Sequence, residues 1–226
     1  MNKKHVVITG AGSGLGASLA HLYADKGYHV TLMGRNSDKL QKVAASLGTS
    51  DYSIHVLDVS SYTAVTTVFR DIRSVDLLIN NAGVGYFELA EALSVEQVDA
   101  MIDINLKGTI FCTQQVLPAM KAAGAGQIIN IVSTAGLEGK VTESVYCASK
   151  FGVKGFTESL QKELAETGIR VSGIYMGGMA TPFWDGVIDE DNMGGMMAAD
   201  DVAEIIVNSM EERRNINVSE LVIRNH

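Results

Sequence analysis

The sequence predicts an α/β fold: one domain built on a doubly wound parallel sheet of about seven strands, with helices on both faces. Short apolar runs rich in β-branched residues alternate with longer helical patterns along nearly the whole chain. Most of these runs are continuously apolar, as strands are when helices cover both faces of a sheet. Strand–helix alternation of this kind gives right-handed crossovers and therefore a parallel sheet.

The expected elements follow one another along the chain. The predicted strands are His5–Thr9, His29–Met33, Ser53–Asp58, Val75–Asn80, Gln127–Val132, Arg170–Tyr175 and Val218–Ile223. The predicted helices are Leu15–Lys26, Ser37–Ser46, Tyr62–Ile72, Val95–Ala122, Val145–Thr167 and Ala199–Arg213. The stretch 181–198 has no clear period and is rich in Gly and Met. It follows the carboxyl end of a strand, where open α/β sheets bind ligands.

Composition limits the class of protein. Of 226 residues, 46% are hydrophobic and 19% charged, with a mean hydropathy of +0.14, as in ordinary globular proteins. A net charge of −8 argues against nucleic acid or an anionic membrane as a partner. There is neither an apolar run long enough for a membrane span nor a signal-peptide pattern. Cys112 and Cys147 fit no metal or disulfide spacing, so we expect a cytoplasmic protein with reduced thiols and no metal site.

A glycine-rich turn links the first predicted strand to the first helix. The residues from Thr9 to Gly16 read T-G-A-G-S-G-L-G, a T-G-x-x-x-G-x-G pattern. Glycines permit positive φ and close backbone approach, and the N-terminus of the following helix favours a pyrophosphate. The turn therefore predicts a dinucleotide site, although a plain glycine-rich βα turn is the alternative. The residues expected to contact the cofactor here are Gly10, Ser13, Gly14, Leu15 and Gly16.

The end of the second strand indicates which nucleotide is preferred. Sites for NAD usually carry an acid there that holds the ribose hydroxyls. This chain has Gly34 followed by Arg35. A guanidinium can bind a 2′-phosphate through two hydrogen bonds, and the small neighbour leaves it room. We therefore expect NADP(H) to be preferred over NAD(H); the alternative is that Arg35 is a solvated turn residue.

Tyr146 and Lys150 are candidates for acid–base chemistry. Four residues apart on a predicted helix, they share one face. An ammonium beside a phenol favours its charged form and can bring the phenol pKa down from about 10. Such a phenol can protonate a carbonyl oxygen or take the proton back from an alcohol. Taken singly, these residues have ordinary alternatives, namely a packing tyrosine and a solvated lysine.

Together, the motifs closely resemble those of the short-chain dehydrogenase/reductase family, and the resemblance covers nearly the whole chain. In the family's order they are T-G-x-x-x-G-x-G, Asp58-Val59, Asn80-Asn81-Ala82-Gly83, Asn105, Ser133, Tyr146 and Lys150. The resemblance implies one NAD(P)-binding domain of Rossmann type over residues 1–226, with a substrate-side segment at about 181–198. It also implies an oxidoreductase acting on a small molecule with a nicotinamide cofactor.

The resemblance also implies a role for each site residue. Tyr146 would be the acid, and Ser133 would hydrogen-bond the same substrate oxygen. Lys150 would bind the nicotinamide ribose and lower the pKa of Tyr146, while Asn105 would hold a water that links Lys150 to solvent. Further cofactor contacts are implied for Asp58, Val59, Asn81, Ala82, Gly83, Tyr146, Lys150 and Thr181.

The substrate side departs from the family pattern. A Pro-Gly pair is common after the sixth strand, but Met176-Gly177-Gly178 stands here, and the segment that follows is short. Apolar residues predict an uncharged, apolar or aromatic ketone, aldehyde or diketone; the alternative is that several of them pack a mobile lid. The chief candidates are Leu137, Met176, Phe183 and Trp184, with Tyr86, Phe87, Met179, Met193, Met196 and Met197 as further ones.

The expected function is reversible, NADPH-dependent reduction of a carbonyl to an alcohol. The alternatives are a pterin- or imine-type reductase on the same site and a non-catalytic NADP(H)-binding sensor. An apolar stripe at helical spacing, together with the pairing of the two long helices in the family, predicts a homodimer or homotetramer. The stripe consists of Val153, Phe156, Leu160 and Leu164.

Overall fold

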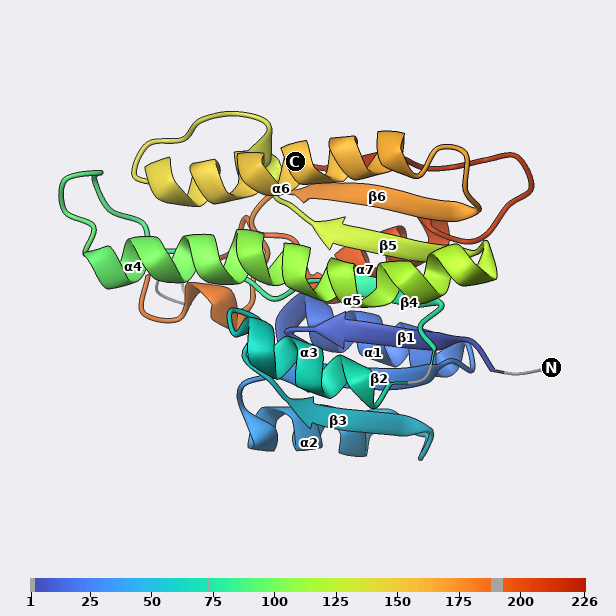
Figure 1. Cartoon of the computed structure of the whole chain (residues 1–226). Helices are drawn as coiled ribbons and strands as arrows, with labels where there is room; N and C mark the ends of the chain where they lie inside the picture. The colour runs from blue at the N-terminus through green and yellow to red at the C-terminus, as the bar shows by residue number, and fades with distance from the viewer. Residues whose placement is uncertain (1–2, 73, 188–192) are drawn as a thin grey trace.

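The structure is a computed structural model that describes residues 3–72, 74–187 and 193–226. Within them, seven parallel strands form one sheet in the order β3-β2-β1-β4-β5-β6-β7 (Figure 1). The order reverses between β1 and β4, which confirms the predicted doubly wound sheet. The strands are β1 (His5–Thr9), β2 (His29–Gly34), β3 (Tyr52–Val56), β4 (Leu77–Asn80), β5 (Gly126–Ile131), β6 (Ile169–Met176) and β7 (Glu220–Ile223).

Helices cover both faces of the sheet. The main ones are α1 (Gly14–Asp25), α2 (Ser37–Ser46), α3 (Tyr62–Arg70), α5 (Gly108–Ala123), α6 (Ser144–Glu163) and α7 (Ala199–Ser209). In Figure 1, α3, α5 and α6 lie in front of the sheet and α1 and α7 behind it. A separate apolar core fills each layer: Leu19 and Ile206 belong to the rear core, and Phe69 and Leu160 to the front one. Burial of both sheet faces explains why the strands are continuously apolar.

The long helix expected over Val95–Ala122 is not regular. It begins as α4 (Val95–Ala100), where the Ser94 side chain accepts from the backbone N–H of Gln97 and the Gln97 side chain accepts from that of Ser94. A π-helical stretch, Met101–Lys107, follows and then continues as α5. Single π-helical turns are rare and often mark functional sites. Apolar periodicity does not distinguish them from an α-helix, which is why the sequence analysis missed this one.

The apolar stripe of α6 faces the chain's own core, so it is not the oligomer surface that the sequence suggested. Val153, Leu160 and Leu164 are at most 3% exposed, and Phe156 packs against the front core. The outward side of the helix carries Phe151 instead, which is 44% exposed. The stripe therefore fixes α6 against the sheet.

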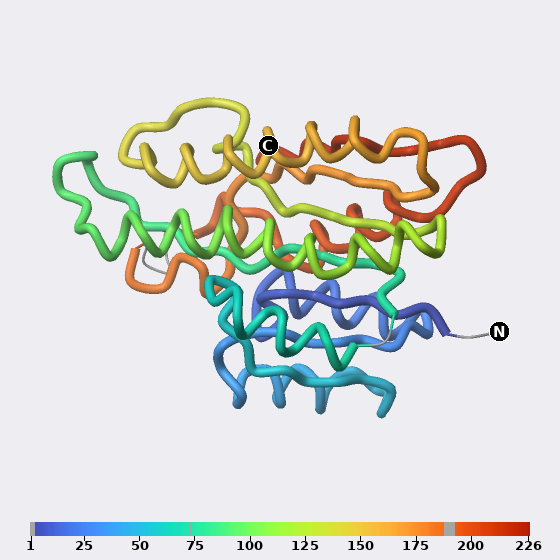
Figure 2. Tube along the Cα trace, in the orientation of Figure 1, coloured from blue at the N-terminus to red at the C-terminus, as the bar shows by residue number. Residues whose placement is uncertain are grey.

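The C-terminal strand, β7, forms one edge of the sheet. Figure 2 follows the chain to its red end, where β7 runs beside β6. The thiols of Cys112 and Cys147 are free and buried. In the part of the chain that the structure describes, no helix is long and apolar enough to cross a membrane, and no cluster of side chains is suited to a metal ion.

Candidate active site

A cleft of about 700 Å³ opens at the carboxyl ends of the central strands, which is the expected ligand position in a doubly wound sheet. Most of the predicted site residues line it. They are Gly10, Ser13, Gly14, Leu15, Arg35, Asn81, Ala82, Gly83, Ser133, Tyr146, Lys150, Met176, Thr181, Phe183 and Trp184. The fold thus brings segments that are far apart in the sequence to one site.

The glycine turn is held in shape by the segment after β4. The Thr9 hydroxyl oxygen accepts hydrogen bonds from the backbone N–H groups of Asn81 and Ala82, both at 3.0 Å. The Asn81 side-chain amide donates to the carbonyl oxygens of Thr9 and Gly10 at 3.0 and 3.2 Å. A Cβ at Gly16 would collide with the Gly10 carbonyl oxygen. Gly16 therefore supports the turn by allowing close packing. The helix α1 begins beside the cleft without a hydrogen bond from its N-cap side chain, and such a helix start favours an anion.

One end of the cleft is basic. Arg35 follows β2, and Lys39 lies on the first turn of α2, which the Asn36 side chain caps by accepting from the Lys39 backbone N–H at 2.9 Å. A Cβ at Gly12 would come within 3.1 Å of Lys39 Cβ, so this lysine packs against the glycine turn. Lys39 was not among the predicted site residues, although its place at the start of the predicted helix Ser37–Ser46, close to Arg35 in the sequence, was a usable signal.

Ser133 has an unusual backbone conformation at the end of β5, with φ 138° and ψ 157°. Residues other than glycine rarely adopt it, and its strain typically clusters at functional sites. The Ser133 hydroxyl accepts from the backbone N–H of Ala135 at 3.1 Å and faces the cleft. The following turn, η2 (Thr134–Gly136), lies against α6. This conformation sets the hydroxyl beside the helix that carries Tyr146.

Tyr146 is 8% exposed and lies on the first turn of α6. Burial raises the pKa of its phenol, Ser133 acts in the opposite direction, and the nearby Glu143 carboxylate raises this pKa further. The chain's own residues therefore do not lower the phenol pKa as the Tyr-x-x-x-Lys spacing suggested. They hold the phenol protonated, which is the form of a proton donor.

Lys150 is 5% exposed, and its ammonium donates to the Ile131 carbonyl oxygen at 3.0 Å. Burial lowers its pKa to about 8. Its Nζ lies 5.7 Å from the centroid of the Tyr146 ring. A buried cation is costly unless it is bound, so its position on the cleft wall is consistent with a role toward a ligand.

Asn105 lies in the π-helical stretch and is 1% exposed. Its side chain accepts from the backbone N–H of Val84 at 2.8 Å and donates to the Val84 carbonyl oxygen at 2.9 Å and to the Ser149 hydroxyl at 3.0 Å. Asn105 thus joins the loop after β4 to α6. Its predicted role in holding a water stays a prediction.

The other end of the cleft has an aromatic wall. Phe87 stacks on Trp184 with centroids 4.9 Å apart, and Phe183 packs edge-on against Trp184 at 5.3 Å. Phe87 also lies edge-on to Tyr146, at 5.5 Å. Two charged residues that the sequence analysis did not select, Lys140 and Glu143, line the cleft as well. This end is therefore aromatic with a charged margin rather than wholly apolar.

Eight predicted residues are not among the described residues that line the cleft: Gly16, Asp58, Val59, Phe87, Asn105, Leu137, Met193 and Met197. Gly16 and Asn105 support its walls instead, and Leu137 packs beside a buried cluster of Val132, Val153 and Tyr175. The Asp58 carboxylate accepts from the N–H and hydroxyl of Ser60, and Val59 packs against Gly108. Of the predicted substrate-side segment, residues 188–192 lie outside those described.

The glycine turn at a helix start and the Ser133, Tyr146 and Lys150 side chains, on a doubly wound sheet, define an oxidoreductase that uses a nicotinamide nucleotide. Residues 4–192 match the family model described as short chain dehydrogenase, and the chain belongs to the short-chain dehydrogenase/reductase family.

Known relatives extend over the whole chain. An uncharacterized oxidoreductase of Staphylococcus aureus is 33% identical over 228 residues, covering 99% of this chain and 98% of that protein. The closed form of serine dehydrogenase complexed with NADP+ has a TM-score of 0.90 at 31% identity, covering 96% of this chain and 93% of that one. An alcohol dehydrogenase from the archaeon Thermococcus sibiricus, complexed with 5-hydroxy-NADP, has a TM-score of 0.90 at 28% identity, covering 99% and 97%.

Proposed function

We propose that the protein reduces a small carbonyl compound to an alcohol with NADPH, and that the reaction is reversible. The observation that carries this proposal is the position of the Tyr146 phenol. It is buried, which raises its pKa, and it lies next to Ser133 on the wall of the cleft. The bound nicotinamide supplies the hydride.

The residues of the chain carry the proton side of this chemistry. Tyr146 donates its proton to the carbonyl oxygen as negative charge develops there. The Ser133 hydroxyl hydrogen-bonds that same oxygen and stabilises the charge. The Lys150 ammonium beside the Tyr146 ring favours the phenolate that remains, because an opposite charge nearby favours an ionised group. In the alcohol-oxidising direction the phenolate takes the proton back.

Arg35 and Lys39 support a preference for NADP(H). Both line the end of the cleft next to the glycine turn. Two cations at one end offer charge-assisted hydrogen bonds to a 2′-phosphate, which NAD lacks. Serine dehydrogenase and the Thermococcus alcohol dehydrogenase are complexed with NADP+ and 5-hydroxy-NADP in their structures, which agrees with this choice.

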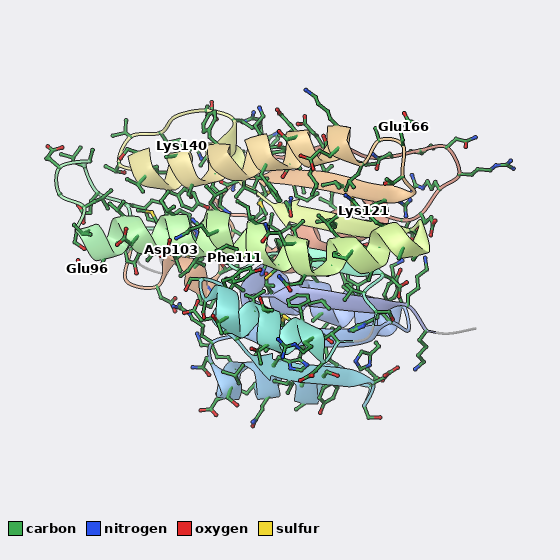
Figure 3. All side chains as sticks on the ribbon, in the orientation of Figure 1. Glu96, Asp103, Phe111, Lys121, Lys140 and Glu166 are labelled. Atoms are coloured by element: carbon green, nitrogen blue, oxygen red, sulfur yellow. The ribbon has the colours of Figure 1, made fainter. Side chains whose placement is uncertain are left out.

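The aromatic wall supports a substrate with an apolar or aromatic body. Phe183 and Trp184 line the cleft with aromatic rings that suit such a group, and Phe87 packs against both of them. Lys140, labelled in Figure 3, lies on the loop that leads into α6 and donates to the Thr134 hydroxyl at 2.9 Å. Together with Glu143 it would favour a polar end on the substrate, directed away from the rings.

A carbonyl panel read by NADPH absorbance tests the proposed function. Wild type should turn over at least one aromatic or apolar ketone, aldehyde or diketone, and Tyr146→Phe should abolish turnover while leaving NADPH binding intact. Turnover of imines or pterins alone would indicate the other reductase chemistry. A wild type that binds NADPH but reduces nothing in a broad panel would favour a nucleotide sensor.

We further propose a homodimer or homotetramer in the cytoplasm. The exposed side of the front helix layer carries Phe151 on α6, and Gly155 one turn later leaves open space for a close approach. Sedimentation should detect a dimer or tetramer at micromolar concentration, and Phe151→Glu should shift it toward monomer. A monomeric wild type would contradict this proposal.

A further inference from the structure

The turn after β6 is joined to the C-terminal strand. Gly177 lies in this turn, directly after the last residue of β6, Met176. Its backbone N–H donates to the Ile223 carbonyl oxygen at 3.0 Å and so extends the pairing of β6 with β7. A Cβ at Gly177 would also collide with the side-chain oxygen of Asn225, at the C-terminal end of the chain.

The Asn225 side-chain amide joins two separate segments. Its nitrogen donates to the Gly178 carbonyl oxygen at 3.0 Å and to the Gly195 carbonyl oxygen at 2.9 Å. Gly178 belongs to the turn after β6, and Gly195 lies in the substrate-side segment. The two NH₂ hydrogens of one asparagine thus bridge the two sides of this part of the cleft.

The turn after β6 and the substrate-side segment also pair through backbone hydrogen bonds, close to the two carbonyl oxygens that the Asn225 amide contacts. The backbone N–H of Met197 donates to the Gly178 carbonyl oxygen at 3.1 Å, and the backbone N–H of Ala180 donates to the Met197 carbonyl oxygen at 3.0 Å. Gly178 therefore accepts from both Met197 and Asn225. Residues on each side of this pairing, including Met179 and Met196, line the cleft, as Asn225 itself does.

We propose that Asn225 is a positioning residue that holds the substrate-side wall, at Gly195 and Met196, against the turn after β6. This inference rests on the proposed function for its kinetic consequence. Asn225 is exposed, and each neutral hydrogen bond contributes modestly, so its loss loosens the wall without unfolding the domain. The glycine turn and the basic end of the cleft lie on other elements, so nucleotide binding is expected to be spared.

The close contact between Gly177 and Asn225 allows the proposal to be tested with a double variant. In Gly177→Ala, the added methyl group displaces the Asn225 side chain. Once Asn225 is alanine, the nearest remaining atom of residue 225 is its backbone nitrogen, 3.5 Å from the added Cβ, which is an ordinary contact. Gly177→Ala should therefore be harmful in the wild type and nearly neutral in the Asn225→Ala background. Such non-additivity is the signature of two residues acting through one contact.

The kinetic experiment compares Asn225→Ala, Gly177→Ala, the double variant and a matched control, His226→Ala, at the adjacent terminal residue. We expect the KM for the carbonyl substrate to rise about fivefold to tenfold in the first three, as the loss of two hydrogen bonds allows. kcat and the NADPH Kd should stay within about twofold, and His226→Ala should match wild type. An unchanged KM in Asn225→Ala, or effects of the two single changes that multiply in the double variant, would overturn the proposal.

Hydrogen exchange tests the contact without relying on activity. The amides of Met197 and Ala180 should exchange faster in Asn225→Ala than in wild type, while those in His226→Ala should not change. Unchanged protection in Asn225→Ala would overturn the proposal even if KM rose. A wild type that reduces no carbonyl would refute the proposed function, and the exchange result would still decide whether Asn225 holds the wall.

Discussion

The ammonium of Lys150 lies against the ring of Tyr146, 5.7 Å from its centroid, and is fixed there by the Ile131 carbonyl oxygen. It faces the ring rather than pairing with the hydroxyl. Both side chains are buried, which raises the pKa of the phenol and lowers that of the amine to about 8. The raised pKa favours the neutral form of the Tyr146 phenol, and the lowered pKa of the Lys150 amine lies near physiological pH.

Replacing Lys150 with methionine should change how stability depends on pH. The pKa of Lys150 is lowered from 10.5 to about 8 in the folded protein, so between these values the folded state binds fewer protons than the unfolded state. The free energy of unfolding then rises with pH across this window, and this contribution is lost as the pH falls toward 8. Relative to Lys150→Met, wild type should gain at most about 3 kcal/mol. Urea unfolding of both proteins at several pH values measures this, and a constant difference would contradict it.

Arg35→Ala and Lys39→Ala should each weaken NADPH binding about tenfold to a hundredfold, since each removes a charge-assisted hydrogen bond to the 2′-phosphate. NADH binding should change by less than about twofold. Titration of intrinsic fluorescence with each nucleotide provides the measurement. Lys42→Ala, on the same helix but absent from the cleft wall, is the matched control. An equal loss for both nucleotides would refute the phosphate role.

The sequence was sufficient for the layer arrangement because the sheet is buried on both faces. Continuous apolar strands such as His5–Thr9, each followed by a helix, leave little choice of fold. The π-helical stretch Met101–Lys107 was not predictable, because a one-residue change in helical bonding leaves no mark in the apolar pattern. The α6 stripe was recognised, but the sequence could not tell a partner's surface from the chain's own sheet.

Site residues were predictable where a local motif carries the geometry. The glycine turn and Tyr146 with Lys150 are local, and they line the cleft as expected. Asn225 gave no signal, because its contact with Gly178 spans 47 residues and depends on where β7 ends. The phenol pKa was misjudged because spacing gives the distance of the lysine but not the burial of the phenol.

Asn105→Ala should destabilise the protein by about 2–4 kcal/mol, because it leaves both backbone groups of Val84 without their partner and removes a donor to the Ser149 hydroxyl. Asn36→Ala, which removes a cap at an exposed helix start, should cost only about 1 kcal/mol. Urea unfolding compares the two. Equal losses would mean that Asn105 does not bind the loop after β4 to α6.

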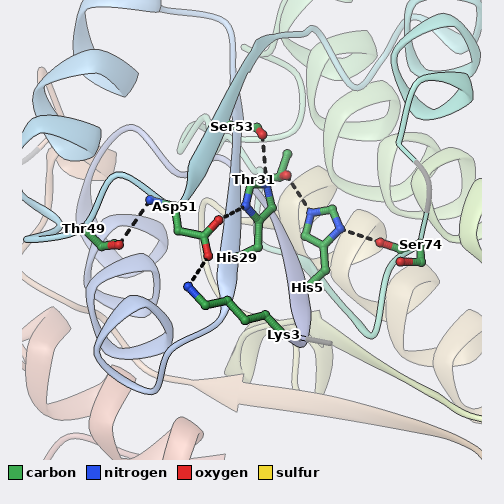
Figure 4. Close-up of polar contacts among 8 residues, drawn as sticks. All are labelled: Lys3, His5, His29, Thr31, Thr49, Asp51, Ser53 and Ser74. Atoms are coloured by element: carbon green, nitrogen blue, oxygen red, sulfur yellow. Dashed lines mark hydrogen bonds and ion pairs between the residues drawn. The ribbon is translucent and has the colours of Figure 1, made fainter. Parts of the chain in front are cut away.

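Two histidines at the amino ends of β1 and β2, opposite the cleft, should make the free energy of unfolding sensitive to mildly acidic pH. Figure 4 shows His5 and His29 side by side, with ring centroids 4.8 Å apart. His29 binds Asp51 at 2.7 Å, and Asp51 also pairs with Lys3 at 2.6 Å. The His5 ring contacts the Ser74 carbonyl oxygen and, at 2.7 Å, the Thr31 hydroxyl, while the Asp76 carboxylate accepts from the His5 backbone N–H at 2.7 Å.

Burial lowers the pKa of His5 from 6.5, and the neighbouring His29 lowers it further, against the raising effects of Ser74, Asp76 and Asp51. A histidine whose pKa is depressed in the folded state contributes stability that is present above pH 6.5 and is lost as the pH falls through its folded value. The free energy of unfolding should therefore decline between about pH 7 and pH 5. His5→Gln should flatten this decline, while His55→Gln, on β3 outside the cluster, should retain it. Urea unfolding across this pH range measures the effect. If the free energy of unfolding depended on pH equally steeply in His5→Gln, the titrating group would lie elsewhere.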